Sequence, residues 1–134
     1  MTEQKKSKGL HIGLWVVQIL LALAFGMAGF MKLTAPLDQL AASGMSFVTE
    51  YSSGMVKFIG ATELLAALGL ILPAALRILP VLTPLAAVGL AVVMVLAANY
   101  HISHSEPFIP NIVFLVLALF VAWGRFKKAP VAAK

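Results

Sequence analysis

Four long apolar segments, separated by shorter and more polar stretches, set the pattern of this chain. A helix needs about 20 apolar residues to cross roughly 30 Å of hydrocarbon, and the segments meet or approach that length. We therefore predict an all-α fold in which four transmembrane helices form one four-helix bundle, a single integral membrane domain over residues 1–134. The expected spans are about 9–31, 56–72, 79–98 and 109–123.

The connections between the spans differ in length. Residues 32–55 are too polar to span a membrane and too apolar to be a free linker, so we expect a short interfacial or re-entrant helix that caps the bundle and ends near residues 52–54. Residues 73–79 are expected to form a turn. Pro80 and Pro84 then fall in the first turns of the third helix, where proline costs least.

The first span also resembles a secretory signal peptide. Lysines precede its apolar core, and Ala22-Leu23-Ala24 offers the small residues of a cleavage site. The apolar run nevertheless continues from Ala24 to Met31 without a polar segment, which favours a retained membrane helix over a cleaved signal.

The composition excludes other classes of protein. Hydrophobic residues make up 61% of the chain and charged residues 11%, too few charges to cover a soluble domain of this size. The net charge of +5 does not indicate nucleic-acid binding, because the cations lie mainly near the two ends. The absence of cysteine excludes disulfides, thiolate metal sites and covalent haem attachment, so a redox function would rest on a bound cofactor or a partner subunit.

The basic residues also predict an orientation. With four spans both termini lie on one side of the membrane, and most of the lysines and arginines fall on that side, whereas Lys32 and Lys57 fall on the other. The positive-inside rule therefore predicts that both termini are cytoplasmic and that residues 32–55 and 99–108 lie outside. The basic residues on the predicted cytoplasmic side are Lys5, Lys6, Lys8, Arg77, Arg125, Lys127, Lys128 and Lys134.

Glu63 interrupts the second apolar segment. Residues at i±3, i±4 and i±7 share a helix face, and the face of Glu63 is rich in small residues, which mark close contact between membrane helices. Glu63 should therefore face the interior of the bundle. Its face holds Val56, Ile59, Gly60, Ala66, Ala67 and Leu70, and the opposite face holds Ala61, Leu65, Leu68 and Leu72.

Lys32 is the predicted partner of Glu63. It lies at the outer end of the first helix, and Glu63 lies about 9 to 13 Å below the start of its own helix at 1.5 Å per residue, a gap that a lysine stem can partly cover. The pair is either a ligand-binding site, since charges inside a membrane are site candidates, or a structural clamp. Gln18 lies close to the same face as Lys32, and the sequence names no partner for it. The face of Lys32 is shared with Leu21, Phe25, Ala28 and Gly29.

A second polar group follows the third span. His101 and His104 stand at i and i+3, with Asn99, Glu106 and Asn111 nearby. A metal would need a third ligand such as Glu106, and a haem would have no opposing histidine inside the membrane, so we assign no metal to this group. Asn111 is expected to form a hydrogen bond between helices.

Several motifs together resemble the DoxX-like family of small four-helix membrane proteins. They occur in order from about Leu14 to Phe126, and those around Lys32 and Glu63 are the most specific. The resemblance implies the bacterial inner membrane as location. Related DoxD proteins are described as membrane subunits of a thiosulfate:quinone oxidoreductase, other relatives associate with redox-detoxification partners, and a distant animal relative is an assembly chaperone. The motifs are "GFMKL", "FIGATELLAALGLILP", "LTPLAAVGLAVVM" and "PNIVFLVLALFVAWGRF".

Two functional hypotheses follow, and neither expects an enzyme on its own or any catalytic residue. In the first, a polar cavity in the outer half binds a quinone or another small amphipathic ligand and supports a redox partner. In the second, the protein is a scaffold or assembly chaperone with Lys32–Glu63 as an internal clamp. A transporter or channel has less support, because four short helices leave a narrow pathway, although small-residue stripes on the first helix would permit a homo-oligomer. The cavity would be lined by Lys32, Glu63, Asn99, His101 and Asn111.

Overall fold

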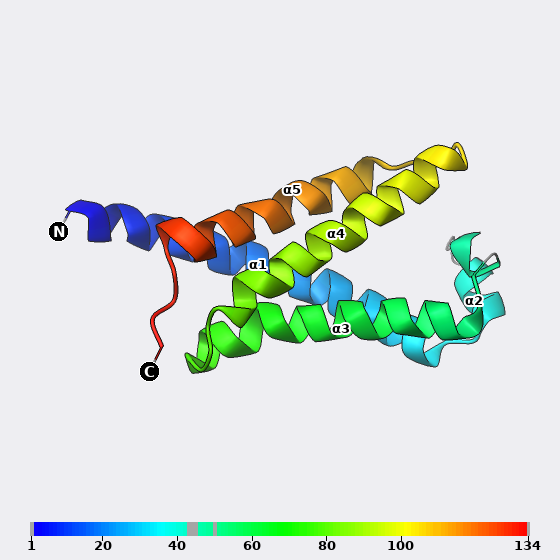
Figure 1. The fold of residues 1–134 in the computed structure, drawn as a ribbon, viewed down its shortest axis with the longest axis horizontal. Helices are drawn as coiled ribbons and strands as arrows, with labels where there is room; N and C mark the ends of the chain where they lie inside the picture. Colours follow the sequence, from blue (N-terminus) through cyan, green and yellow to red (C-terminus); the bar gives the residue numbers. More distant parts are fainter. Residues whose placement is uncertain (1, 43–45, 50, 134) are drawn as a thin grey trace.

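The computed structural model describes residues 2–42, 46–49 and 51–133, and its long elements are all helices (Figure 1). Within those ranges four helices are long and apolar enough to cross a membrane, which confirms the predicted all-α class and the four spans. The long helices are α1 (Thr2–Thr34), α3 (Ser53–Leu76), α4 (Leu82–Ser103) and α5 (Ile109–Trp123). The short ones are α2 (Leu37–Ala42), the 3-10 turn η1 (Ser46–Thr49) and the π-helical turn η2 (Gly124–Lys128), which continues α5.

The four long helices pack in a ring. α1 packs on α3, α3 on α4, α4 on α5, and α5 returns to α1. Both termini and the turn between α3 and α4 lie at one end, which we call the terminal end (left in Figure 1). The α1–α3 connection with α2 and the α4–α5 connection lie at the other, which we call the opposite end. The cytoplasmic location of the terminal end stays a prediction.

The main core lies between the four long helices and is apolar. Its fully buried leucines come from three of them, Leu14 and Leu21 from α1, Leu70 from α3 and Leu90 from α4. The outward faces carry large aliphatic side chains instead, such as Leu65, which is 68% exposed. Such an apolar exterior is stable when lipid rather than water surrounds it.

A second, smaller core fixes the capping segment at the opposite end. Leu40 of α2 and Val48 of η1 are buried together with Val56 of α3. The next helix begins where Ser52, the N-cap of α3, accepts a hydrogen bond from the backbone N–H of Met55. N-cap serines satisfy one of the free N–H groups of the first turn, which explains why the capping segment ends at this point.

The structure differs from the sequence expectation around Pro73. The helix does not end there, since α3 runs through Pro73 to Leu76 and is followed by Arg77 at φ 58° in the left-handed region. The next helix, α4, then begins at Leu82 rather than Leu79, which leaves Pro80 in the preceding turn. Helices tolerate an internal proline where neighbouring side chains satisfy the freed carbonyl, and α4 supplies such a side chain here.

Candidate functional site

Lys32 and Glu63 meet directly between α1 and α3. The Lys32 Nζ lies 2.5 Å from Glu63 Oε1, and the two residues are 8% and 3% exposed. Each charge compensates the other in surroundings where an isolated charge would be strongly unfavourable. The pair can therefore hold two helices together, and a charged carboxylate beside an ammonium could also accept a hydrogen bond from a bound molecule.

The ion pair sits beside the closest approach of the two helices. A β-carbon added to Gly29 would lie 2.5 Å from the carbonyl oxygen of Gly60, and one added to Gly60 would lie 2.7 Å from the β-carbon of Lys32. The backbones are thus in contact, as small residues allow between membrane helices. Glycine at both positions brings α3 close enough for the lysine to reach the carboxylate.

The burial pattern of α3 matches the face predicted for Glu63. The residues on that face are buried except Ile59, which is partly buried, whereas Leu65, Leu68 and Leu72 on the other face are exposed. The helical period predicts the buried face of α3, because one stripe of small residues and one of large residues run along the same helix. The buried residues are Val56, Gly60, Glu63, Ala66, Ala67, Leu70 and Ala74.

The histidines of the second polar group have local partners at the opposite end. His101 Nδ1 lies 2.8 Å from Glu106 Oε1, and both side chains are partly exposed. His104 Nδ1 lies 2.8 Å from the carbonyl oxygen of Tyr100, and its ring stacks on the tyrosine ring at 4.0 Å. In the described part of the chain no group of three or more histidines and carboxylates is placed to hold a metal ion.

The two asparagines of this group differ in their burial. Asn99 is exposed on α4. Asn111, at the start of α5, is partly buried, and its amide donates to the sulfur of Met94 on α4 at 3.8 Å. The contact joins two helices, as expected for Asn111. Its acceptor is the thioether sulfur of Met94. The role of these residues as ligand contacts stays a prediction.

A polar network that the sequence did not predict lies at the terminal end. Arg125 in η2 is 3% exposed, and its Nε donates to Gln18 Oε1 at 2.6 Å. Gln18, which is fully buried on α1, donates in turn to the carbonyl oxygen of Leu70 on α3 at 2.6 Å. The guanidinium also contacts His11 Nδ1 and the carbonyl oxygen of Ala129, each at 2.8 Å.

This network joins α1, α3 and η2 through the side chains of His11, Gln18 and Arg125 and the backbone carbonyl of Leu70. The sequence pattern predicts a role in membrane orientation for Arg125 and no partner for Gln18, because helical periodicity describes one helix at a time. A signal was nevertheless present, since a glutamine inside an apolar run needs a polar partner and Arg125 directly follows the last apolar run. The guanidinium also lies 5.8 Å from the ring centre of Trp15, within the range of a cation–π contact.

Comparison with known proteins identifies one family. The family model described as the DoxX-like family matches residues 16–124. The match includes Gln18, Lys32 and Glu63 and ends one residue before Arg125. Neither the comparison with curated proteins nor that with solved structures gave a match.

Proposed function

The chain belongs to the DoxX-like family, and on that premise we propose that this small integral membrane protein acts as a non-enzymatic scaffold for a partner membrane subunit. The observation that carries the proposal is the direct contact of Lys32 with Glu63 at 2.5 Å. The two charges form an ion pair with each other, so neither needs a ligand as its counter-charge. The pair therefore acts as a clamp between α1 and α3.

The packing around the pair supports the same function. Backbone contact between Gly29 and Gly60 leaves no room for a molecule at the crossing of the two helices. A clamp of this kind makes α1 and α3 a rigid unit, and the unit presents large apolar side chains such as Leu23 and Phe58 to its surroundings. A partner helix would pack on such a surface in place of lipid. In this proposal the protein lies in the bacterial inner membrane with cytoplasmic termini.

A charge exchange tests the clamp. Glu63→Gln and Lys32→Met each remove one charge of the buried ion pair, so each should lower the thermal midpoint in detergent and reduce co-purification of a crosslinked membrane partner. The double variant Lys32→Glu with Glu63→Lys restores opposite charges and should recover part of both losses. Unchanged stability in the single variants, or an equal yield of the partner from the single variants and the unaltered chain, would contradict the scaffold function.

Quinone binding remains the competing prediction for the same pair. It requires further polar groups to converge on Glu63, whereas Asn99 is exposed and Asn111 contacts Met94. Titration of the purified protein with a quinone, with Glu63→Gln as control, separates the two functions. Saturable binding that the variant loses would favour a ligand site and a redox partner over a scaffold.

A further inference from the structure

Arg125 is a buried cation whose hydrogen-bond acceptors are all neutral. They are the amide oxygen of Gln18, the unprotonated ring nitrogen of His11 and the backbone carbonyl oxygens of Ala129 and His11. The guanidinium has five N–H groups. Its Nη2 forms only the longest of these bonds, at 3.4 Å to the carbonyl oxygen of His11, so Nη2 retains donor capacity toward a further acceptor.

Among the carboxylates whose side chains the structure describes, which are Asp38, Glu63 and Glu106, none compensates this charge. Asp38 and Glu106 belong to the opposite end, and Glu63 is bonded to Lys32. Neutral acceptors satisfy hydrogen bonds but leave the positive charge in surroundings of low dielectric constant, where charges are usually paired. An anion from outside the chain would therefore be strongly stabilised next to Arg125.

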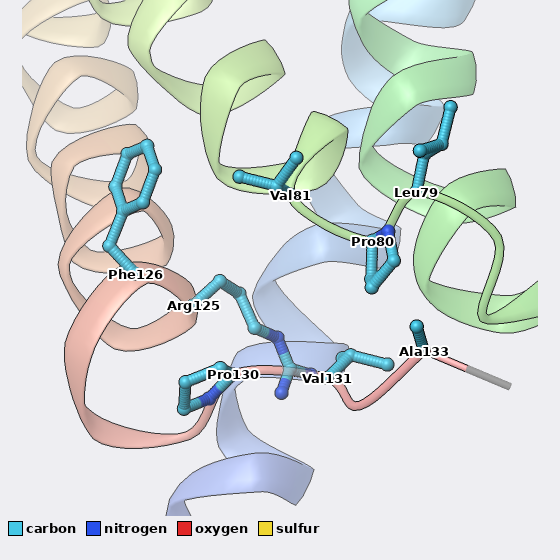
Figure 2. A pocket seen from close by; sticks show the side chains of 8 residues that line it. All are labelled: Leu79, Pro80, Val81, Arg125, Phe126, Pro130, Val131 and Ala133. Atoms are coloured by element: carbon cyan, nitrogen blue, oxygen red, sulfur yellow. The ribbon is translucent and has the colours of Figure 1, made fainter.

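A pocket of about 340 Å³ opens beside Arg125. Its walls are the turn between α3 and α4, η2 and the C-terminal segment 130–133, and the Arg125 side chain reaches from η2 toward Val131 (Figure 2). The volume lies near the lower end of the roughly 300–1,000 Å³ that ligand sites span. The other lining residues are all apolar, so Arg125 is the charged group of the pocket.

The apolar walls continue into the outer surface of the bundle. Leu79 is 65% exposed, Val81 51% and Phe126 42%. A ligand with an anionic head at Arg125 could therefore extend an apolar tail along these side chains into the surrounding lipid. Lys127 and Lys128 are exposed on the same turn, η2, and add positive charge at the level where lipid headgroups lie.

We propose that this pocket binds the phosphate of an anionic phospholipid from the leaflet at the terminal end, with the Arg125 guanidinium as its counter-charge. Basic pockets between membrane helices on the cytoplasmic side are typical sites for such headgroups. The His11 and Gln18 bonds hold the guanidinium in place, and its remaining donor capacity serves the phosphate oxygens. This site is separate from Lys32–Glu63 and does not depend on the scaffold function.

Native mass spectrometry of the detergent-purified full chain tests the site with two probes. Phosphatidylglycerol should bind with a stoichiometry of one and about tenfold or more tighter than phosphatidylcholine with the same acyl chains. Arg125→Gln should remove this preference. Because Arg125→Gln could also disturb folding, Val81→Trp provides a second variant that fills the pocket from an exposed position and leaves the Arg125 bonds intact.

The controls separate a built site from general attraction to a basic surface. Lys127→Gln removes an equal charge from the same turn without touching the pocket, so it should keep the preference. Equal binding of both lipids to the unaltered protein, or an unchanged preference in Val81→Trp, would overturn the proposal. Displacement of phosphatidylglycerol by inorganic phosphate, with the same rise in thermal midpoint from phosphate alone, would also overturn it and assign the site to a free anion.

Discussion

The hydroxyl of Thr83 on α4 donates to the carbonyl oxygen of Gly69 on α3 over 2.9 Å, and this bond replaces one that α3 cannot make within itself. The helical donor to Gly69 would be the backbone nitrogen of Pro73, which carries no hydrogen. Thr83 is fully buried, so its hydroxyl has no water as an alternative partner. The bond accounts for the continuation of α3 through Pro73 and couples α3 to the first turn of α4.

Thr83→Val should destabilise the protein, because it removes the hydroxyl that donates to the carbonyl oxygen of Gly69. The volume of the side chain changes little. The expected loss is about 1–3 kcal/mol, the usual penalty for an unsatisfied buried polar group. A lower thermal midpoint in detergent, measured by scanning fluorimetry or circular dichroism, would report it.

Pro73→Ala provides the internal control for that experiment. It restores an N–H that can reach Gly69 along the helix, so Thr83→Val should cost less in the Pro73→Ala background than in the unaltered chain. Equal losses in both backgrounds would show that the hydroxyl stabilises the protein in some way other than through Gly69.

Gly29→Ala should separate α1 from α3. The new β-carbon would lie 2.5 Å from the carbonyl oxygen of Gly60 and 2.7 Å from the backbone nitrogen of Leu64, and neither backbone atom can move aside alone. We expect a loss of about 1–3 kcal/mol from overpacking, again measured as a fall in the thermal midpoint. Separation of the helices would also lengthen the Lys32–Glu63 contact.

Gly13→Ala is the matched control on the same helix. A β-carbon at Gly13 meets nothing within 4 Å, so only the helix propensity changes. Alanine is better than glycine in a helix interior by about 0.5–1 kcal/mol, and the variant should be as stable as the unaltered chain or more stable. Comparable losses at Gly13 and Gly29 would contradict a close crossing at Gly29.

Gln18→Leu should be among the more damaging single substitutions in α1. It removes the side-chain donor to the Leu70 carbonyl oxygen and the acceptor of Arg125 Nε at once, and the buried Nε–H is left unsatisfied. Gln39→Leu, at an exposed position on α2, makes the same chemical change outside the core. Thermal midpoints that fall equally in both variants would count against the network.

Glu106→Gln should have little effect on stability. Its bond to His101 is partly exposed, with side-chain exposures of 28% and 23%, and such pairs contribute about 0–1 kcal/mol. Glu63→Gln should therefore lower the thermal midpoint clearly more than Glu106→Gln when the two are measured side by side. The reverse order would mean that the second polar group, rather than the ion pair, stabilises the bundle.

The helix faces could be predicted from the sequence because they depend on local periodicity. Glu63 lies on a face rich in small residues, and Lys32 shares its face with Ala28 and Gly29. Charged residues are so few inside the spans that their pairing could be predicted. The path of α3 could not be predicted in the same way. Pro73 has the pattern of a helix end, and the group that prevents the break, Thr83, belongs to another helix.

The Arg125 network shows a second limit of sequence patterns. Gln18 and Arg125 are 107 positions apart, and their contact depends on the relative heights of α1 and α5 in the bundle. Positive charge at the end of a span is also explained by membrane orientation, so the sequence gives no reason to expect the hydrogen bonds of Arg125. Burial of the guanidinium depends on the chain after η2, where Arg125 bonds to Ala129 and Arg77 bonds to Ala132.

The ion pair between α1 and α3 also has a consequence for biosynthesis. A charged residue near the centre of a single helix raises the free energy of insertion from the translocon by about 2.5–3.5 kcal/mol. Glu63 is such a residue in α3, and its contact with Lys32 in the last turn of α1 compensates its charge when the two helices enter lipid as a hairpin. The first two spans of this chain should therefore leave the translocon together, with α2 as the hinge between them.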